Sequence, residues 1–168
     1  MRILIVRHAP AGDRTVFAKT GKPDSERKLT PKGRQKMKKA AKGLRRILPS
    51  IDLIATSPLA RAAQTARILG RAYGKVRTVE LGELAPGGSP ETVLRSLQDF
   101  AKIPTLALVG HEPYLSALAG RMLASGADVK IELKKGAACL IGFDGPPRAG
   151  AGTLLWSLSP SQLRKLAG

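Results

Sequence analysis

The N-terminus holds an apolar run that is followed at once by an arginine and a histidine. Residues 3–6 (Ile-Leu-Ile-Val) suit a buried strand, and Arg7 and His8 come directly after it. This pattern favours an open α/β sheet, in which ligands bind in a crevice at the carboxyl ends of the strands. The only other histidine, His111, closes a second run of the same kind, at residues 106–109. We therefore expect both histidines at the same kind of position, just beyond a strand.

Strand-like and helix-like segments alternate along the chain, which favours an α/β fold with a largely parallel sheet. We expect strands at residues 2–6, 52–55, 77–79 and 105–109, helices at 31–48, 59–73, 91–101 and 113–124, then antiparallel strands at 136–143 and 153–158 and a last helix at 160–166. A long polar loop at residues 9–29 is suspected of function. Residues 1–168 are expected to form a single three-layer α/β/α domain.

Composition adds a few limits. The 168 residues, 43% of them hydrophobic, are enough for one ordinary core. The apolar runs are too short to span a bilayer, and Arg7 and His8 interrupt the first one, so we expect a cytoplasmic protein without membrane contact. Cys139 is the only cysteine and can form no internal disulfide. Its apolar neighbours predict a buried, inert thiol in a core strand.

Positive charge is concentrated in the first half of the chain. The formal net charge is +17, and residues 1–80 hold 20 Lys or Arg against 5 Asp or Glu. The predicted helix segment 32–46 carries eight basic residues and no acid. Such a surface suits an anionic substrate or an acidic partner, or is simply a solvated face. Aromatic residues, at 4%, are scarce for stacking on bases, so nucleic acid is the less favoured partner.

Arg7, His8, Arg61 and His111 each stand just after a predicted strand or at the start of the next helix. Guanidiniums, imidazoles and helix N-termini together favour a phosphoryl group as ligand. A neutral histidine can form a covalent phosphoryl intermediate. His8 is the better attacker because the neighbouring Arg7 disfavours its imidazolium form. His111 would serve as an imidazolium or an N–H donor, and no acidic or cysteine cluster accompanies the histidines to bind a metal.

Four motifs, in order, resemble those of a known family. They are Arg-His at residues 7–8, Arg-Lys-Leu-Thr-Pro-Lys-Gly at 27–33, Thr-Ser-Pro-Leu-Ala-Arg-Ala-Ala-Gln-Thr-Ala at 56–66 and Val-Gly-His at 109–111. The chain is similar in these motifs to the histidine phosphatase superfamily, the phosphoglycerate mutase-like group, and especially to its SixA-type phosphohistidine phosphatases. The resemblance covers almost the whole chain and implies a phosphoglycerate mutase-like fold.

The resemblance also assigns roles. It implies that His8 is the phospho-accepting nucleophile and that Arg7, Arg61 and His111 complete the phosphate pocket, with no metal and no cofactor. The family's proton donor is a glutamate in a Leu-x-Glu context, which Glu83 matches in this chain. Glu83 is therefore the candidate general acid, which would protonate the leaving group and then activate water.

Two departures from the family pattern bear on the substrate. Ala9 replaces the usual glycine after the first motif, which SixA-like members often tolerate. The Thr and Asn that follow this motif in many mutases are absent from residues 10–13, which weakens a sugar-phosphate mutase assignment. The chain is also too short for the helical cap of the larger members, and an uncapped pocket suits a bulky substrate such as a phosphorylated side chain on a protein.

Three functions follow as hypotheses. The first is a metal-independent phosphatase that acts on phosphohistidine in a protein partner. The second is a small-molecule phosphomonoesterase for sugar-phosphate-like metabolites. The third, of another class, is a non-enzymatic binder in which the basic helix 32–46 holds nucleic acid or another polyanion. Binding of that kind should weaken steeply with salt, whereas turnover of a small ester should change only modestly.

Overall fold

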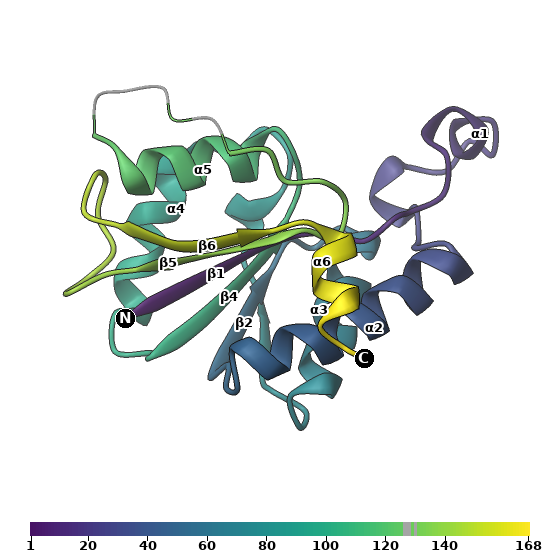
Figure 1. Cartoon of the computed structure of the whole chain (residues 1–168). Coiled ribbons are helices and arrows are strands. Elements are labelled where there is room, and N and C mark those ends of the chain that lie inside the picture. Colours follow the sequence, from purple (N-terminus) through teal and green to yellow (C-terminus); the bar gives the residue numbers. More distant parts are fainter. Residues whose placement is uncertain (126–128, 130) are drawn as a thin grey trace.

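Strands and helices alternate through most of the chain, as Figure 1 shows for the computed structural model, which describes residues 1–125, 129 and 131–168. The strands are β1 (Arg2–Arg7), β2 (Leu53–Thr56), β3 (Thr78–Glu80), β4 (Thr105–Gly110), β5 (Ala138–Gly142) and β6 (Thr153–Leu158). The α-helices are α1 (Arg14–Ala18), α2 (Pro31–Ile47), α3 (Ala60–Ala72), α4 (Pro90–Ser96), α5 (Tyr114–Leu123) and α6 (Pro160–Lys165), with 3-10 helices at η1 (Asp24–Glu26), η2 (Gly82–Leu84) and η3 (Leu97–Phe100). Each predicted strand and helix has a counterpart among them.

The described strands form one six-stranded sheet in the order β3-β2-β4-β1-β5-β6. β1 to β4 are parallel, β5 is antiparallel to β1, and β6 is antiparallel to β5. The predicted mostly parallel sheet with antiparallel C-terminal strands is thus confirmed.

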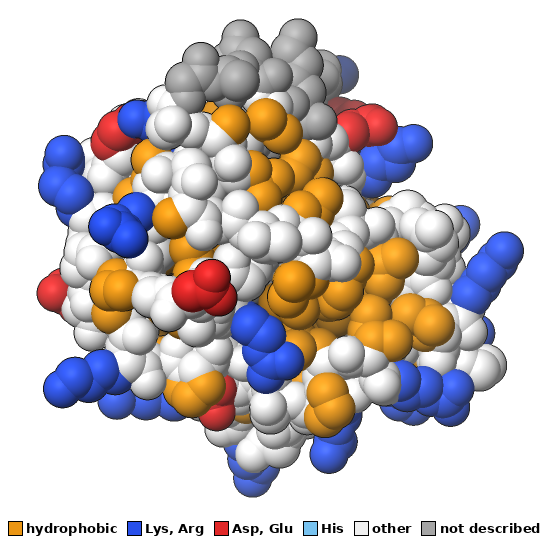
Figure 2. All heavy atoms as spheres, turned by 60° about the vertical axis from the view of Figure 1, so that its left-hand side comes forward, with side chains coloured by type: hydrophobic (Ala, Val, Ile, Leu, Met, Phe, Trp, Pro, Cys, Tyr) orange, Lys and Arg blue, Asp and Glu red, His pale blue; other side chains and the backbone are white. Residues whose placement is uncertain are grey.

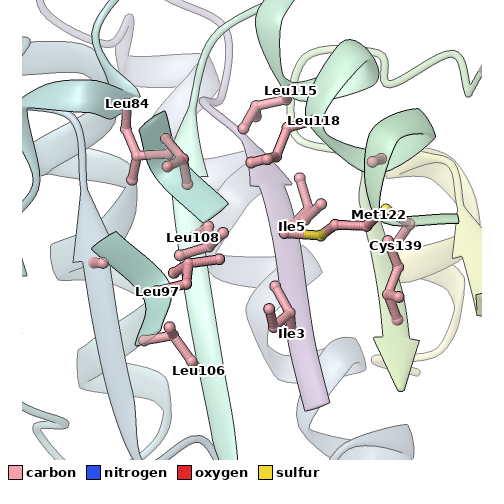
Figure 3. Packing of buried hydrophobic residues seen from close by; sticks show 14 of the residues in the cluster. Ile3, Ile5, Leu84, Leu97, Leu106, Leu108, Leu115, Leu118, Met122 and Cys139 are labelled. Atoms are coloured by element: carbon pink, nitrogen blue, oxygen red, sulfur yellow. The ribbon is translucent and has the colours of Figure 1, made fainter. Parts of the chain in front are cut away.

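Helices cover both faces of this sheet because successive residues of a strand point to opposite sides. In β1, Leu4 and Val6 pack with buried residues of α2, α3 and α6. Ile3 and Ile5 pack on the other face, against α4 and α5 (Figure 3). Cys139 is fully buried in this second cluster, as predicted. Burial raises the pKa of its thiol to about 12.

The sheet has a topological switch point at the centre. The chain leaves β1 toward α2 on one face, and it leaves the neighbouring strand β4 toward α5 on the other. Connections that diverge in this way open a crevice at the carboxyl ends of the two strands. Both histidines follow these two strands, so the fold places them at the crevice.

Two segments differ from the sequence-based expectation. The polar loop predicted at residues 9–29 contains α1 and η1, and Figure 1 shows α1 standing away from the sheet. Asp13 caps α1 by accepting a hydrogen bond from the Val16 backbone N–H at 2.9 Å, although none of the α1 residues is buried. The helix predicted at residues 91–101 divides into α4 and η3. In the described part of the chain, no helix is long and apolar enough to cross a membrane.

Candidate active site

The two histidines are brought together by the pairing of β1 with β4. In this parallel pair Arg7 lies opposite Gly110, and the backbone N–H of His8 donates to the Gly110 carbonyl at 3.0 Å. His8 and His111 therefore leave adjacent strands at the same level. Their rings are both buried, with centroids 5.1 Å apart and planes inclined by 52°. The predicted meeting of both histidines at one site follows directly from this register.

Arg61 reaches the same crevice from the next strand. β2 pairs with β4, and after it the Ser57 backbone N–H donates to the Val109 carbonyl at 2.9 Å. This contact starts α3 at the carboxyl edge of the sheet and places Arg61 in its first turn, 5% exposed. The positive charge of Arg61 is among the influences that lower the pKa of both His8 and His111.

Three nitrogen atoms of the predicted site residues are buried without a hydrogen-bond partner in the part of the chain that the structure describes. They are Nε of Arg7, Nε of Arg61 and Nδ1 of His111. Arg7 is held by its Nη1, which donates to the Leu133 carbonyl at 2.8 Å. Buried polar groups are costly when unpaired, and such groups gather at functional sites. Guanidinium N–H groups that are buried and have no protein acceptor are suited to donate hydrogen bonds to the oxygens of a bound oxyanion.

His8 is a neutral imidazole with a defined tautomer. Its Nδ1 lies 2.7 Å from the Ala9 carbonyl oxygen. A carbonyl only accepts hydrogen bonds, so Nδ1 carries the proton and Nε2 keeps its lone pair. Burial lowers the pKa of His8 to about 4, a shift that the Ala9 bond opposes and that Arg61 and Arg7 increase. Burial is therefore a larger cause of the neutral form than Arg7, the only cause expected from the sequence.

His111 is neutral as well. Burial, followed by the neighbouring His8 and Arg61, lowers its pKa to about 3. Its Nε2 lies 2.8 Å from Oγ of Ser57, a residue of the motif at 56–66 to which no catalytic role was assigned from the sequence. Of the two forms considered for His111, imidazolium or N–H donor, these surroundings favour the neutral donor.

Glu83 lies at the same edge of the sheet but is not bonded to the histidines. It belongs to η2, which follows β3, and its Oε1 accepts a hydrogen bond from Ser96 Oγ at 2.8 Å. The neighbouring Leu84 packs beside Gly110, where a Cβ would lie 3.3 Å from the Leu84 carbonyl oxygen. The structure thus brings the Glu83 segment beside the strand end that precedes His111.

Asp24 and Arg27 belong to the site although the sequence analysis assigned them no role. Asp24 forms ion pairs with Arg61 Nη1 at 3.0 Å and Arg27 Nε at 2.7 Å. Arg27 is buried and also donates from Nη1 to the Gly12 carbonyl at 2.7 Å. The hydrogen bond from Arg27 is the main cause that lowers the pKa of Asp24. The available signal was the long polar loop before the Arg-Lys-Leu-Thr motif.

The donors at this site suit an anion rather than a metal ion. Guanidiniums and two neutral imidazoles surround the crevice, and the Asp24 carboxylate is already paired with two arginines. Among the residues that the structure describes, no three His, Cys, Asp or Glu side chains gather closely enough to hold a metal.

The chain is similar to known proteins both in sequence and in structure. The family model of the histidine phosphatase superfamily (branch 1) matches residues 3–87. An uncharacterized protein of Picosynechococcus sp. is 35% identical over 137 residues, covering 80% of this chain and 81% of that protein. The structure of the protein histidine phosphatase SixA complexed with tungstate is similar, with a TM-score of 0.81 and 27% identity over 97% of this chain and 99% of that one. Phosphoserine phosphatase from Entamoeba histolytica shares the fold, with a TM-score of 0.68 and 17% identity over 96% and 98% of the two chains.

These similarities agree with the geometry. The segment matched by the family model includes Arg7, His8 and Arg61, three of the residues that meet at the crevice. The SixA structure covers nearly the whole chain, so the phosphoglycerate mutase-like fold is confirmed, as is a phosphatase of the histidine phosphatase type. The chain belongs to the histidine phosphatase superfamily, branch 1.

Proposed function

We propose that this protein is a metal-independent phosphatase that forms a covalent phosphohistidine on His8 and acts on phosphohistidine carried by a protein partner. The observation that carries the proposal is the pair of buried, neutral histidines 5.1 Å apart, with the Nδ1 proton of His8 held by the Ala9 carbonyl. This tautomer leaves the Nε2 lone pair of His8 available as a nucleophile.

In the first step, Nε2 of His8 attacks the phosphorus atom of the substrate. The new Nε2–P bond forms as the bond from phosphorus to the substrate's imidazole nitrogen breaks. Arg7, Arg61 and His111 donate hydrogen bonds to the phosphoryl oxygens, whose negative charge they balance. Glu83 protonates the departing nitrogen as the general acid.

In the second step, water replaces His8 on the phosphoryl group. Glu83, now a carboxylate, takes a proton from the attacking water, whose oxygen bonds to phosphorus as the Nε2–P bond breaks. Inorganic phosphate leaves, and His8 returns to its neutral form. The sequence of steps consumes one water and needs no metal or redox partner.

The preference for a protein substrate is supported by the similarity to SixA and by the absence of a cap insertion in the described part of the chain. The basic surface of α2 supports an acidic partner. Lys38, Lys42 and Arg45 of α2 face Arg71 of α3 across a groove of about 400 Å³ whose lining also includes Ile68. A small-molecule phosphomonoesterase remains the alternative, since the fold is shared with a phosphoserine phosphatase.

Hydrolysis of p-nitrophenyl phosphate and of a phosphohistidine peptide, each with a chelator present, tests the proposal. We expect wild type to release phosphate, His8→Ala to release none, and Lys39→Gln, an exposed variant on α2 outside that groove, to match wild type. A substrate-derived phosphoryl group, stable in alkali and labile in acid, should appear on His8 in quenched samples. Turnover by His8→Ala would refute the nucleophile. Silence of wild type on both substrates would favour a polyanion binder.

A further inference from the structure

A second, basic pocket opens directly beside the crevice. It has a volume of about 240 Å³ and lies between α2, α6 and the segment that precedes β5. Each of these three elements contributes one cation, Lys36 from α2, Lys135 from the segment before β5 and Arg164 from α6. The rest of its lining is small or apolar: Ala9, Pro10, Met37, Ala40, Gly136, Pro160 and Ser161.

The topology explains why these elements meet at the same edge as the histidines. β6 is antiparallel to β5, which is antiparallel to β1, so β6 ends at the edge where β1 ends. α6 starts there, with Ser159 as its N-cap and a capping box to Gln162. α2 also starts at this edge, at Pro31, because it follows the loop after β1.

Backbone contacts tie the pocket to His8. The Gly136 backbone N–H donates to the His8 carbonyl at 3.1 Å, and Ala9, which also lines the pocket, accepts the hydrogen bond from the His8 ring. The charge of Lys135 is close enough to affect the protonation of His8. A molecule whose phosphoryl group reaches His8 can therefore place a neighbouring group in this pocket.

The pocket's charges are uncompensated. No acidic residue lines it, and within residues 1–125, 129 and 131–168 none of Lys36, Lys135 and Arg164 forms an ion pair. Like charges in one pocket repel each other, so an anion that enters gains from all three. The apolar lining, Met37 and Ala40 among it, suits methylene groups that lead to such an anion. A glutamate or aspartate side chain meets both conditions, whereas free phosphate has no apolar part.

We propose that this pocket, defined by Lys36, Lys135 and Arg164, is a subsite for an acidic side chain that flanks the phosphohistidine of the protein substrate. The inference rests on the proposed function and makes it more specific, because it names a sequence preference around the phosphorylated residue. The pocket would act on recognition of the substrate and not on the chemistry at His8.

The test uses phosphohistidine peptides that differ by one charge. One peptide has neutral residues around the phosphohistidine, and each member of a series carries a single glutamate at one flanking position, with the matching glutamine peptide as control. For the favoured position we expect kcat/KM to be about threefold to tenfold higher with glutamate than with glutamine, as for one carboxylate near several partly exposed cations. A ratio near one at every position would overturn the subsite.

Variants of the pocket residues test whether the preference for glutamate arises in this pocket. In the double variant Lys36→Gln/Arg164→Gln the glutamate-to-glutamine ratio should fall close to one. Lys39→Gln removes a charge from the same helix, but Lys39 is exposed and lines neither this pocket nor the groove at Lys42, so the ratio should stay as in wild type. An equal loss of the ratio in Lys39→Gln would assign the preference to overall charge and refute the pocket. Lys36 is exposed, so the single variant Lys36→Gln gives the same test without risk to folding.

The same measurements separate the phosphatase activity from the subsite. If wild type hydrolyses p-nitrophenyl phosphate and the neutral peptide but shows no glutamate preference, the subsite is wrong and the phosphatase assignment stands. If wild type hydrolyses neither, the proposed function fails and the subsite fails with it. If glutamate raises kcat/KM and the preference disappears only in the pocket variants, the subsite is supported.

Discussion

Burial decides the protonation of both site histidines. His8 is 6% exposed and His111 is 3% exposed, and burial is the largest cause that lowers the pKa of each. An imidazolium in this setting would lose hydration and face the charges of Arg61 and its neighbours. A bound phosphoryl group, which is anionic, would oppose both effects. Burial thus keeps His8 in the neutral form that attacks phosphorus, and a bound phosphoryl group can accept a hydrogen bond from His111.

These shifted histidines predict a dependence of stability on pH. The pKa values are about 4 for His8 and about 3 for His111 in the folded protein, against 6.5 in the unfolded chain. Below pH 6.5 the unfolded chain binds more protons than the folded protein. The free energy of unfolding should therefore fall as the pH is lowered, by up to about 1.4 kcal/mol per pH unit for each histidine. Above pH 6.5 both states hold neutral histidines, so the histidines cause no loss of stability there. Urea unfolding of wild type from about pH 7 to about pH 4.5 measures the slope.

The matched variant is His111→Gln, which removes one of the two titrating groups. Its slope over the same pH range should be about half that of wild type, because only His8 then contributes. An unchanged slope would mean that other groups cause the pH dependence.

Asp24 predicts competition with phosphate. Its carboxylate pairs with Arg61, which is a proposed phosphate ligand. In Asp24→Asn this competing charge is lost, while the backbone carbonyl at position 24 still accepts a hydrogen bond from Arg61 Nη1. Inorganic phosphate should then inhibit p-nitrophenyl phosphate hydrolysis more strongly, with an inhibition constant lower by up to about fivefold. Asp13→Asn, which removes a charge from the same loop, is the control. Weaker inhibition in Asp24→Asn would instead identify Asp24 as a residue that positions Arg61.

At the level of elements, α2 fixes the segment that follows His8. A Cβ on Gly33 would lie 2.0 Å from the Pro10 carbonyl oxygen, so glycine lets the start of α2 approach this segment closely. Thr30 caps the helix by accepting from the Gly33 backbone N–H at 2.9 Å. The Thr-Pro-x-Gly part of the motif therefore has a structural purpose, which is to hold the backbone next to the nucleophile.

Two alanine substitutions on α2 should separate this purpose from ordinary packing. Gly33→Ala would strike Pro10, and Gly43→Ala would strike the Leu163 carbonyl oxygen, 1.9 Å from the added Cβ. Both variants should lose about 1–3 kcal/mol of stability through overpacking. Only Gly33→Ala should also lower kcat/KM, because only Pro10 is close to His8 in the chain. Thermal unfolding and p-nitrophenyl phosphate hydrolysis measure the two effects, with Gly145→Ala, whose Cβ meets nothing within 4 Å, as control. Equal activity of the two α2 variants would contradict the argument.

Elements with a strong local signal were predictable, and those held by tertiary contacts were not. The apolar period of α2 and its Thr-Pro start make that helix recognisable from sequence, as the apolar run at residues 106–109 does for β4. α1 has no buried residue, so no hydrophobic period marks it. η1 contains Asp24, whose carboxylate pairs with Arg61, 37 positions further along the chain, and such a contact leaves no local pattern.

At the scale of the molecule, the site was predictable because the topology of an α/β sheet brings strand ends together. Residues 7–8, 61 and 111 are far apart in sequence, yet each lies at or soon after the end of a parallel strand and so reaches the same edge. What depends on neighbours in space could not be predicted in the same way. The contact of Ser57 with His111, the role of Asp24 and burial as the main cause of the pKa shifts all arise from packing.

The net charge of +17 acts on the molecule as a whole. Basic side chains outnumber acidic ones even on the face in Figure 2, where hydrophobic side chains also reach the surface. A field of this sign attracts every phosphorylated substrate, whether or not α2 takes part in recognition. Ionic strength therefore separates a catalyst from a polyanion binder, since salt screens attraction at a distance but affects a buried site much less.

If the protein is an enzyme, we expect kcat/KM for p-nitrophenyl phosphate to fall by about threefold or less when salt is raised from about 0.05 M to about 0.5 M. Salt screens only the long-range attraction that brings the substrate to the site. kcat at saturating substrate should stay constant, because the reacting groups are buried. Binding of a single-stranded oligonucleotide, followed by fluorescence anisotropy, should be weak and fall far more steeply over the same range, through release of counterions. The variant Lys38→Gln/Lys42→Gln should weaken this binding further and leave kcat unchanged. If tight, salt-sensitive oligonucleotide binding accompanied an inactive crevice, polyanion binding through α2 would be the better account of the charge.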